Sequence, residues 1–177
     1  MSKKVKKKST YANRGKRFEL FINEKNSYYL MNDIAVIHKK PTPMRIINRK
    51  GGILTAIFAE ASTTDFNGVW QGVYLDFDAK QTALNTSFPL KNVGDHQYKH
   101  LLSVEKHGGV AFLLVRFSKL DEVYLLPIEI LERYWEAAKQ GGRKSIPYDT
   151  FGQEAFKVEN YDYLPKLEEY MIEYKYI

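Results

Sequence analysis

Apolar residues along the chain follow two spacings, which predict two kinds of element. Between Arg14 and about Leu30, Phe18 and Ile22 lie about one helical turn apart among polar residues, and this spacing predicts an amphipathic helix. Short β-branched runs and apolar–polar alternation predict strands elsewhere, including a buried strand over 34–37. The expected helices span 14–30, 93–107, 128–140 and 164–176, and the expected strands span 34–37, 53–59, 110–117 and 122–126, with a strand pair within 63–80.

The strand pair within 63–80 has one apolar face and one charged face. The chain is expected to turn near Gln71 and Gly72, so that residues 65–70 pair with 73–78. This pairing places the carboxylates of Asp65 and Asp78 side by side. Lys80 is two residues beyond Asp78, so both side chains project from the same face, with their Cα atoms about 6.5–7 Å apart.

The order of helices and strands predicts an α/β fold with a mixed central β-sheet flanked by helices. A chain of 177 residues with 44% apolar content is expected to form a single domain over residues 11–177. Two prolines and several basic residues around 41–60 predict a protruding β-hairpin there. Residues 1–10 are expected to form a disordered basic arm, because like charges repel and little apolar surface is available to pack.

Charge and composition narrow the classes of partner and site. The formal net charge of +6, with eight Lys or Arg and no acid in residues 3–17, favours a polyanion such as nucleic acid, although many basic proteins bind none. Without cysteine, a metal would need oxygen or imidazole ligands. The sequence has no long apolar run and no secretory signal, so we expect a cytoplasmic, nucleoid-associated protein that does not enter membranes.

The paired acids indicate metal-dependent hydrolysis of a phosphodiester. Adjacent Asp65 and Asp78 carboxylates repel, and a divalent cation such as Mg²⁺, with Mn²⁺ as the alternative, relieves that repulsion. The same cation is a Lewis acid for a phosphoryl oxygen and lowers the pKa of a bound water. Lys80 would orient the water or stabilise the developing charge. The alternative is a solvated strand face on which Asp78 and Lys80 form a weak surface pair.

Six blocks of sequence, extending from Tyr11 onward through nearly the whole chain, carry a family resemblance. The blocks are Tyr11–Gly15, Ile37–Pro43, Ser62–Val69, Asp76–Lys80, Thr86–Leu90 and Gly142–Ile146. In these blocks the chain resembles RecU-type Holliday junction resolvases of the PD-(D/E)XK nuclease superfamily. The resemblance implies a restriction-endonuclease-like fold, a homodimer, and metal-dependent cleavage of four-way DNA junctions in recombination and repair.

The resemblance also assigns roles to residues of the paired-acid site. It implies that Asp65 and Asp78 are metal ligands, together with Thr63, and that Lys80 is the catalytic lysine. Glu19 on the first helix would be a supporting catalytic acid, and the alternative for it is an exposed helix carboxylate. The family usually has Glu at the position of Asp78, and the shorter side chain leaves the metal distance and the preferred ion open.

Basic and polar residues around the site are expected to contact DNA. The segment around 41–60 corresponds to a family stalk that enters the junction, and it is shorter here, so selectivity for branched DNA is less firmly implied than cleavage. Ordinary solvation of a basic hairpin is the alternative for its charges. Trp70 and Trp135 are expected in the core or in a dimer interface. The expected DNA contacts are Arg14, Lys39, Lys40, Arg45, Arg49, Lys50, Thr64 and Gln97.

Three functions remain open at this point. The first is a dimeric resolvase that makes paired nicks across a four-way junction and works beside a RecA-type recombinase. The second is a non-catalytic DNA-binding or strand-annealing protein that modulates a recombinase. The third is a nuclease of the same superfamily that is less selective for DNA structure. No P-loop and no serine-hydrolase motif is present, so ATP-driven and acyl-transfer roles have no local support.

Overall fold

A computed structural model describes residues 11–58 and 63–177, and within these ranges the side chains of all residues except 11–14 and Phe58. The basic arm expected over residues 1–10 lies outside the described residues. So do residues 59–62, which the sequence places at the end of the expected hairpin. No described helix is long and apolar enough to cross a membrane.

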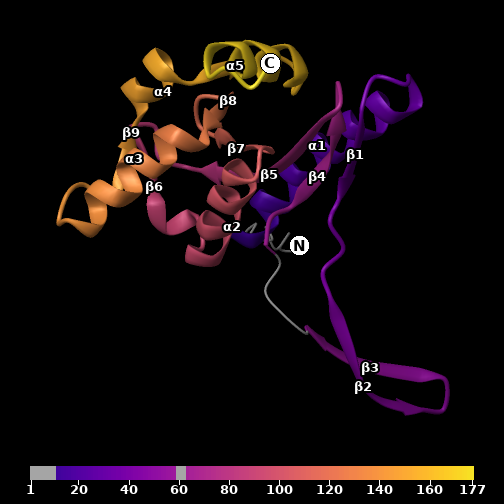
Figure 1. Cartoon of the computed structure of the whole chain (residues 1–177). Coiled ribbons are helices and arrows are strands. Elements are labelled where there is room, and N and C mark those ends of the chain that lie inside the picture. The colour runs from indigo at the N-terminus through magenta and orange to yellow at the C-terminus, as the bar shows by residue number, and fades with distance from the viewer. Residues whose placement is uncertain (1–10, 59–62) are drawn as a thin grey trace, which may run out of the picture.

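A six-stranded mixed sheet forms the centre of the fold (Figure 1). Its order is β1-β4-β5-β7-β8-β10, in which β5 and β7 run parallel and the other neighbours run antiparallel. The mixed sheet expected from the sequence is therefore confirmed. The strands are β1 (Val36–Lys39), β4 (Phe66–Trp70), β5 (Val73–Thr82), β7 (Val110–Phe117), β8 (Glu122–Pro127) and β10 (Phe156–Val158).

Helices cover both faces of the sheet, and each face has its own hydrophobic core. On one face, Phe77 of β5 packs in a cluster with Phe18 and Leu167, which come from helices α1 and α5. On the other face, Leu113 of β7 clusters with Leu101 of α2 and with residues of α3. The predicted flanking helices are thus confirmed. They are α1 (Tyr11–Met31), α2 (Asp95–Lys106), α3 (Ile128–Lys139) and α5 (Leu164–Glu173).

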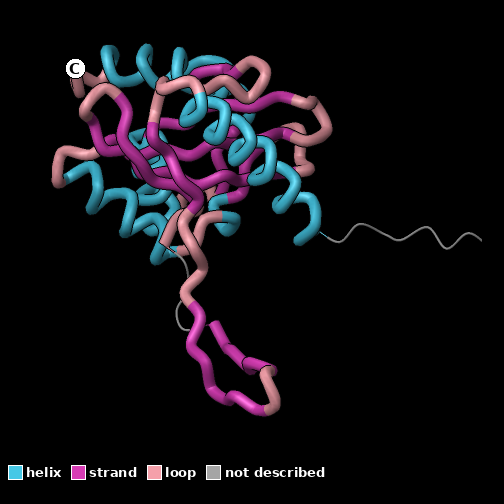
Figure 2. The backbone as a smooth tube through the Cα atoms, turned by 90° about the vertical axis from the view of Figure 1, so that its right-hand side faces the viewer, coloured by secondary structure: helices cyan, strands magenta, loops and turns pink. Residues whose placement is uncertain are grey.

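A two-stranded hairpin projects far from this body (Figures 1 and 2). Its strands β2 (Met44–Lys50) and β3 (Ile53–Phe58) pair only with each other. Gly51 and Gly52 form the turn, and both have positive φ values that favour glycine. Every residue of β2 is exposed, so the hairpin contributes little to the core.

The edge strand β1 departs from its prediction. The strand expected over 34–37 begins two residues later, at Val36, and it lies at the edge of the sheet with only one face buried. Ile34 and Val36 are 43% and 47% exposed, and Ile37 of this strand packs in the core. A short β-branched run does not distinguish an edge strand from a central one, since that depends on which neighbours the sheet provides.

Short elements between the long ones were not expected from the sequence. Elements of three to seven residues are too short to show a periodicity, so the sequence pattern does not indicate them. Two of them, β6 and β9, form a separate two-stranded sheet beside the main one. The short elements are β6 (Ser87–Pro89), the 3₁₀ helix η1 (Leu90–Asn92), β9 (Ser145–Pro147) and α4 (Tyr148–Glu154), together with β10.

Candidate active site

The β4–β5 hairpin sets the register of the candidate site. Gln71 and Gly72 form its tight turn with positive φ values, as hairpin turns of this length require. Phe66 pairs with Phe77, so the next position along, Asp65, comes opposite Asp78. The Asp65 carboxylate accepts a hydrogen bond at 3.2 Å from the backbone N–H next to Asp78, that of Ala79. The structure therefore brings the two predicted acids together.

Asp78 is fully buried, although the sequence offered a solvated strand face as an alternative. The Lys80 ammonium lies 3.0 Å from its Oδ1, and the Gln97 amide donates to its Oδ2 at 2.5 Å. No hydrogen bond within the described residues satisfies Oδ1 beyond this ion pair. Burial raises the pKa of Asp78 well above its usual value, and the Asp65 charge raises it further, while Lys80 lowers it.

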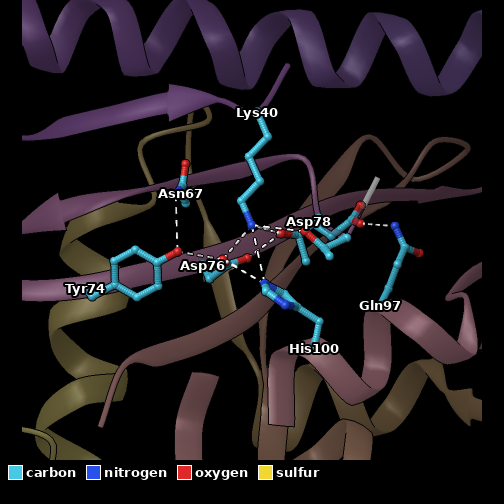
Figure 3. A network of polar contacts seen from close by, with 9 residues as sticks. Lys40, Asn67, Tyr74, Asp76, Asp78, Gln97 and His100 are labelled. Carbon is cyan, nitrogen blue, oxygen red and sulfur yellow. Dashed lines mark hydrogen bonds and ion pairs between the residues drawn. The ribbon is translucent and has the colours of Figure 1, made fainter. Parts of the chain in front are cut away.

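Gln97 links the start of α2 to this carboxylate (Figure 3). Its side-chain oxygen accepts the backbone N–H of Gly94 at 3.0 Å, which satisfies a donor at the start of the helix. That hydrogen bond fixes the amide group, and its nitrogen then reaches Asp78. Gln97, which the sequence predicts as a DNA contact, orients the Asp78 carboxylate in this structure.

A cavity of about 600 Å³ opens beside Lys80. Glu19 of α1 and Lys91 of η1 line it together with Lys80 of β5, so three distant segments meet there. Glu19 is 23% exposed at its side chain and forms an ion pair with Lys39 at 2.6 Å. It is thus neither a freely exposed carboxylate nor in direct contact with Asp78, but it faces the same cavity as Lys80.

A second buried carboxylate, Asp76, lies two residues before Asp78 on the same face of β5. Four polar side chains surround it (Figure 3). The Lys40 ammonium lies 2.6 Å from Oδ2, the Tyr74 hydroxyl donates to the same oxygen at 2.9 Å, and His100 Nε2 lies 3.0 Å away. The Thr64 hydroxyl donates to Oδ1. All the oxygens of this carboxylate therefore have partners.

Two of the residues predicted to contact DNA, Thr64 and Lys40, belong to this network. Thr64 is fully buried, and its hydroxyl donates to Asp76. Lys40 is only 16% exposed at its side chain and also donates to Thr64 at 2.6 Å. Both residues belong to the buried network, because an unpaired buried carboxylate would be costly. Sequence reasoning assigned no role to Asp76 and His100, although Asp76 shares the alternation of Asp78.

The Asp76 network also holds the root of the projecting hairpin. Lys40 directly follows β1, where the chain leaves for the hairpin, and Thr64 lies where it returns. The backbone N–H of Lys40 donates to the carbonyl of Asp65 at 2.8 Å, which ties the two legs together. Asp65 is therefore placed by the same contacts that anchor the hairpin.

Among the described side chains, no hydrogen bond or ion pair joins the other predicted residues to the paired acids. Thr63, expected as a metal ligand, is exposed, and its hydroxyl lies 3.4 Å from the Lys40 ammonium. Arg45, Arg49 and Lys50 are exposed on β2 and have no ion-pair partner among the described residues. Arg14 belongs to α1, but its side chain lies outside the described part.

The donor chemistry of the paired acids fits a hard divalent cation. Asp65 and Asp78 present carboxylate oxygens, and one buried oxygen of Asp78 has no hydrogen bond. A cation there would offset both the burial of Asp78 and its repulsion from Asp65. Among residues 11–58 and 63–177, no group of three acidic, histidine or cysteine side chains is arranged to hold a metal. Asp65 and Asp78 would therefore be the two carboxylate ligands that the protein supplies.

Comparisons with known proteins place the chain in a family. The family model described as "Recombination protein U" matches residues 13–172. "Holliday junction resolvase RecU" of Bacillus pumilus is 45% identical over 172 residues, covering 94% of this chain and 82% of that protein. The protein of the same name from Pediococcus pentosaceus is 44% identical over 162 residues, with 88% and 81% covered, and that from Staphylococcus aureus is 45% identical over 164 residues, with 89% and 78% covered.

Among solved structures, the chain is similar to Archaeoglobus fulgidus Hjc, "a Holliday junction resolvase from an archaeal hyperthermophile". That match has a TM-score of 0.48 and 13% identity, and it covers 82% of this chain and 91% of the other. The family match extends over nearly all of the present sequence, and the relatives align along most of their own length. This chain belongs to the RecU family.

Proposed function

We propose that this protein is a Holliday junction resolvase, a metal-dependent endonuclease that makes paired nicks in four-way DNA junctions during homologous recombination and DNA repair. The observation that carries the proposal is the arrangement of Asp65, Asp78 and Lys80, with one buried Asp78 oxygen left without a hydrogen bond. The named resolvases to which the chain is similar supply the substrate class.

Asp65 and Asp78 would hold Mg²⁺, with Mn²⁺ as the other candidate. When bound, the cation supplies a Lewis acid for the phosphate and a water of lowered pKa. Lys80 lies against Asp78 and lines the cavity, so its ammonium can stabilise negative charge on a phosphate held there. Gln97 keeps the Asp78 carboxylate in one orientation.

Two symmetric cuts require two active sites related by a two-fold axis, which supports a homodimer as the working form. The exposed basic residues of β2 would contact phosphates of a junction arm. We place the reaction in the cytoplasm on nucleoid DNA, with a RecA-type recombinase as a candidate partner. The net charge of +6 supports binding to DNA of any shape, so selectivity for junctions is the part that needs a direct test.

The test compares a labelled four-way junction with a matched linear duplex, each with Mg²⁺, with Mn²⁺ and with chelator. We expect cleavage of the junction in a divalent metal and no cleavage with chelator. Binding without cleavage in either metal would support a non-catalytic DNA-binding protein that modulates a recombinase. Equal cleavage of both DNAs would support a less selective nuclease of the same superfamily.

Variants of the paired-acid site identify the residues responsible. Asp65→Ala and Lys80→Ala are expected to abolish nicking while the affinity for the junction, measured with chelator present, is retained. Lys106→Ala removes an exposed lysine at the end of α2 and is the control for lost charge. Cleavage at the normal rate by either site variant contradicts the assignment.

A further inference from the structure

We propose that a groove beside the active-site cavity binds an unpaired nucleotide of the DNA strand that is being cut, with its base on an apolar floor and its phosphates on a lysine rim. This inference rests on the proposed nuclease function, because it names a part of the substrate. The groove encloses about 710 Å³, within the range of pockets that bind small ligands.

One wall of the groove comes from two sequence blocks that contribute neither of the paired acids. Residues 86–90 and 142–146 are more than fifty positions apart, yet β6 pairs with β9 through Phe88 and Ile146. The backbone N–H of Leu90 also donates to the carbonyl of Lys144 at 3.2 Å, so a second backbone contact joins the two blocks. The wall of the groove is therefore held by backbone pairing.

The groove continues directly from the active-site cavity. Leu84, Pro89 and Lys91 line both of them. A DNA strand whose phosphate lies at Lys80 therefore has a continuous path across Lys91 into the groove. A base that remains paired in duplex DNA is not accessible to such a depression, whereas an unstacked base is.

The chemistry of the lining suits a nucleotide. The floor is apolar, with Leu90, Val93 and Ala138 beside the indole of Trp135. The rim carries Lys91, Lys139 and Lys144. An aromatic ring beside cationic groups is the combination that binds single-stranded nucleic acid through stacking and phosphate contacts.

Two of the rim lysines are available to an anion. Lys91 and Lys144 are exposed and have no ion-pair partner in the described ranges, whereas Lys139 pairs with Glu136 at 2.8 Å. The one acid in the lining, Asp95, is already paired with Lys99 at 2.5 Å. The rim therefore presents net positive charge, which favours an anionic occupant over a neutral one.

Trp135 is held in place before any ligand arrives. It stacks on Tyr98 with ring centroids 4.4 Å apart and an angle of 18°, and the Tyr98 hydroxyl donates to Glu136 at 2.9 Å. A fixed aromatic ring loses little conformational entropy when a base stacks on it. The sequence led us to expect Trp135 in the core or in a dimer interface. It packs against the core, and it also lines the groove.

The experiment uses Trp135 as its own reporter. The chain has two tryptophans, so the full-length Trp70→Phe variant leaves Trp135 as the only one. Its fluorescence is titrated with a short oligothymidylate in chelator, and separately with an abasic strand of equal length. We expect the oligothymidylate to quench the fluorescence and the abasic strand to bind roughly 10-fold more weakly.

Surface variants test the rim without disturbing the fold. In the same background, Lys91→Ala with Lys144→Ala is expected to raise the half-saturating oligothymidylate concentration roughly 10-fold, since each lost phosphate contact weakens binding. Lys106→Ala, which removes the same kind of charge far from the groove, is expected to leave it unchanged. Equal quenching by both strands, no quenching, or no difference between the rim and control variants overturns the proposal.

Failure of the groove and failure of the nuclease can be told apart, because the titration needs neither metal nor cleavage. Normal junction cleavage without quenching would contradict the proposed binding groove and support the resolvase function. Quenching that requires the base and the rim lysines would support the groove as a single-strand binding site. If the same protein cleaves no junction in Mg²⁺ or Mn²⁺, the nuclease function is contradicted.

Discussion

Asp76 and Asp78 lie two residues apart on the same face of β5, and both are fully buried, yet their surroundings differ. Four polar side chains surround Asp76, and both of its oxygens have partners. Asp78 has one hydrogen bond from Gln97 and one ion pair with Lys80, and its Oδ1 has no hydrogen bond within the described residues.

The difference separates a structural carboxylate from a reactive one. Burial of a charge is costly unless hydrogen bonds and an opposite charge compensate for it. Around Asp76 the compensation is complete, and the result is a rigid anchor for the hairpin legs. Around Asp78 it is incomplete. Burial, together with the Asp65 charge, raises the pKa of Asp78 well above its usual value although Lys80 lowers it, so the charged form remains disfavoured. A divalent cation would favour the charged form.

The largest expected effect is on catalysis at Asp78. Asp78→Asn keeps the shape of the side chain and removes the charge that would hold the cation, so cleavage of a four-way junction is expected to fall by at least ~10³-fold, or about 4 kcal/mol in the barrier. Single-turnover nicking of labelled junction in Mg²⁺ measures it. Asp149→Asn, an exposed acid in the first turn of α4, is the control. A variant that retains a tenth of the activity contradicts the comparison.

The second effect is on stability at Asp76. Asp76→Asn leaves the Lys40 ammonium without its counter-charge, and we expect the free energy of unfolding to fall by about 3 kcal/mol, at the lower end for broken buried pairs because Lys40 retains some exposure. Urea denaturation measures the loss. Adding Lys40→Met to Asp76→Asn removes the unpaired charge and is expected to recover part of the stability. If Asp76→Asn were as stable as the wild type, Asp76 would not be the anchor.

A smaller effect is expected at the residue that orients Asp78. Gln97→Ala removes the amide that donates to Oδ2, and partners of this kind change metal affinity or activity roughly 10- to 100-fold. The Mg²⁺ concentration for half-maximal nicking is expected to rise, which loss of a purely structural contact would not cause. Gln153→Ala, an exposed glutamine on α4, is the control. An unchanged Mg²⁺ dependence would remove Gln97 from the site.

The smallest effect is the pH dependence of stability without metal. The pKa of Asp78 is raised in the folded state, so the folded protein holds this proton more tightly than the unfolded chain. Stability from Asp78 is therefore full below the ordinary aspartate pKa and is lost as pH rises towards the raised pKa, by at most about 1.4 kcal/mol per pH unit. Urea titrations of wild type and Asp78→Asn should diverge over this interval. Parallel curves would show that the pKa of Asp78 is not raised in the folded state.

Much of the arrangement of the site could be predicted from the local sequence. A two-residue turn at Gln71 and Gly72 and strict alternation along β5 set the register, and that register places Asp65 opposite Asp78 and puts Lys80 on the same face. These are short-range consequences of strand geometry, and the predicted juxtaposition is observed. The longer helices followed in the same way from helical periodicity.

Tertiary structure decided how those groups are surrounded. Alternation shows that Asp76 and Asp78 share a face, but α2 determines that the face is buried, and only the folded chain brings Lys40 to one acid and Gln97 to the other. Strands β6 and β9 are too short to show a period, so their pairing could not be predicted from the sequence. The groove beside Trp135 depends on that pairing. The sequence thus determined which residues project together, because that depends on neighbours along the strand, whereas their charge compensation depends on contacts between distant segments.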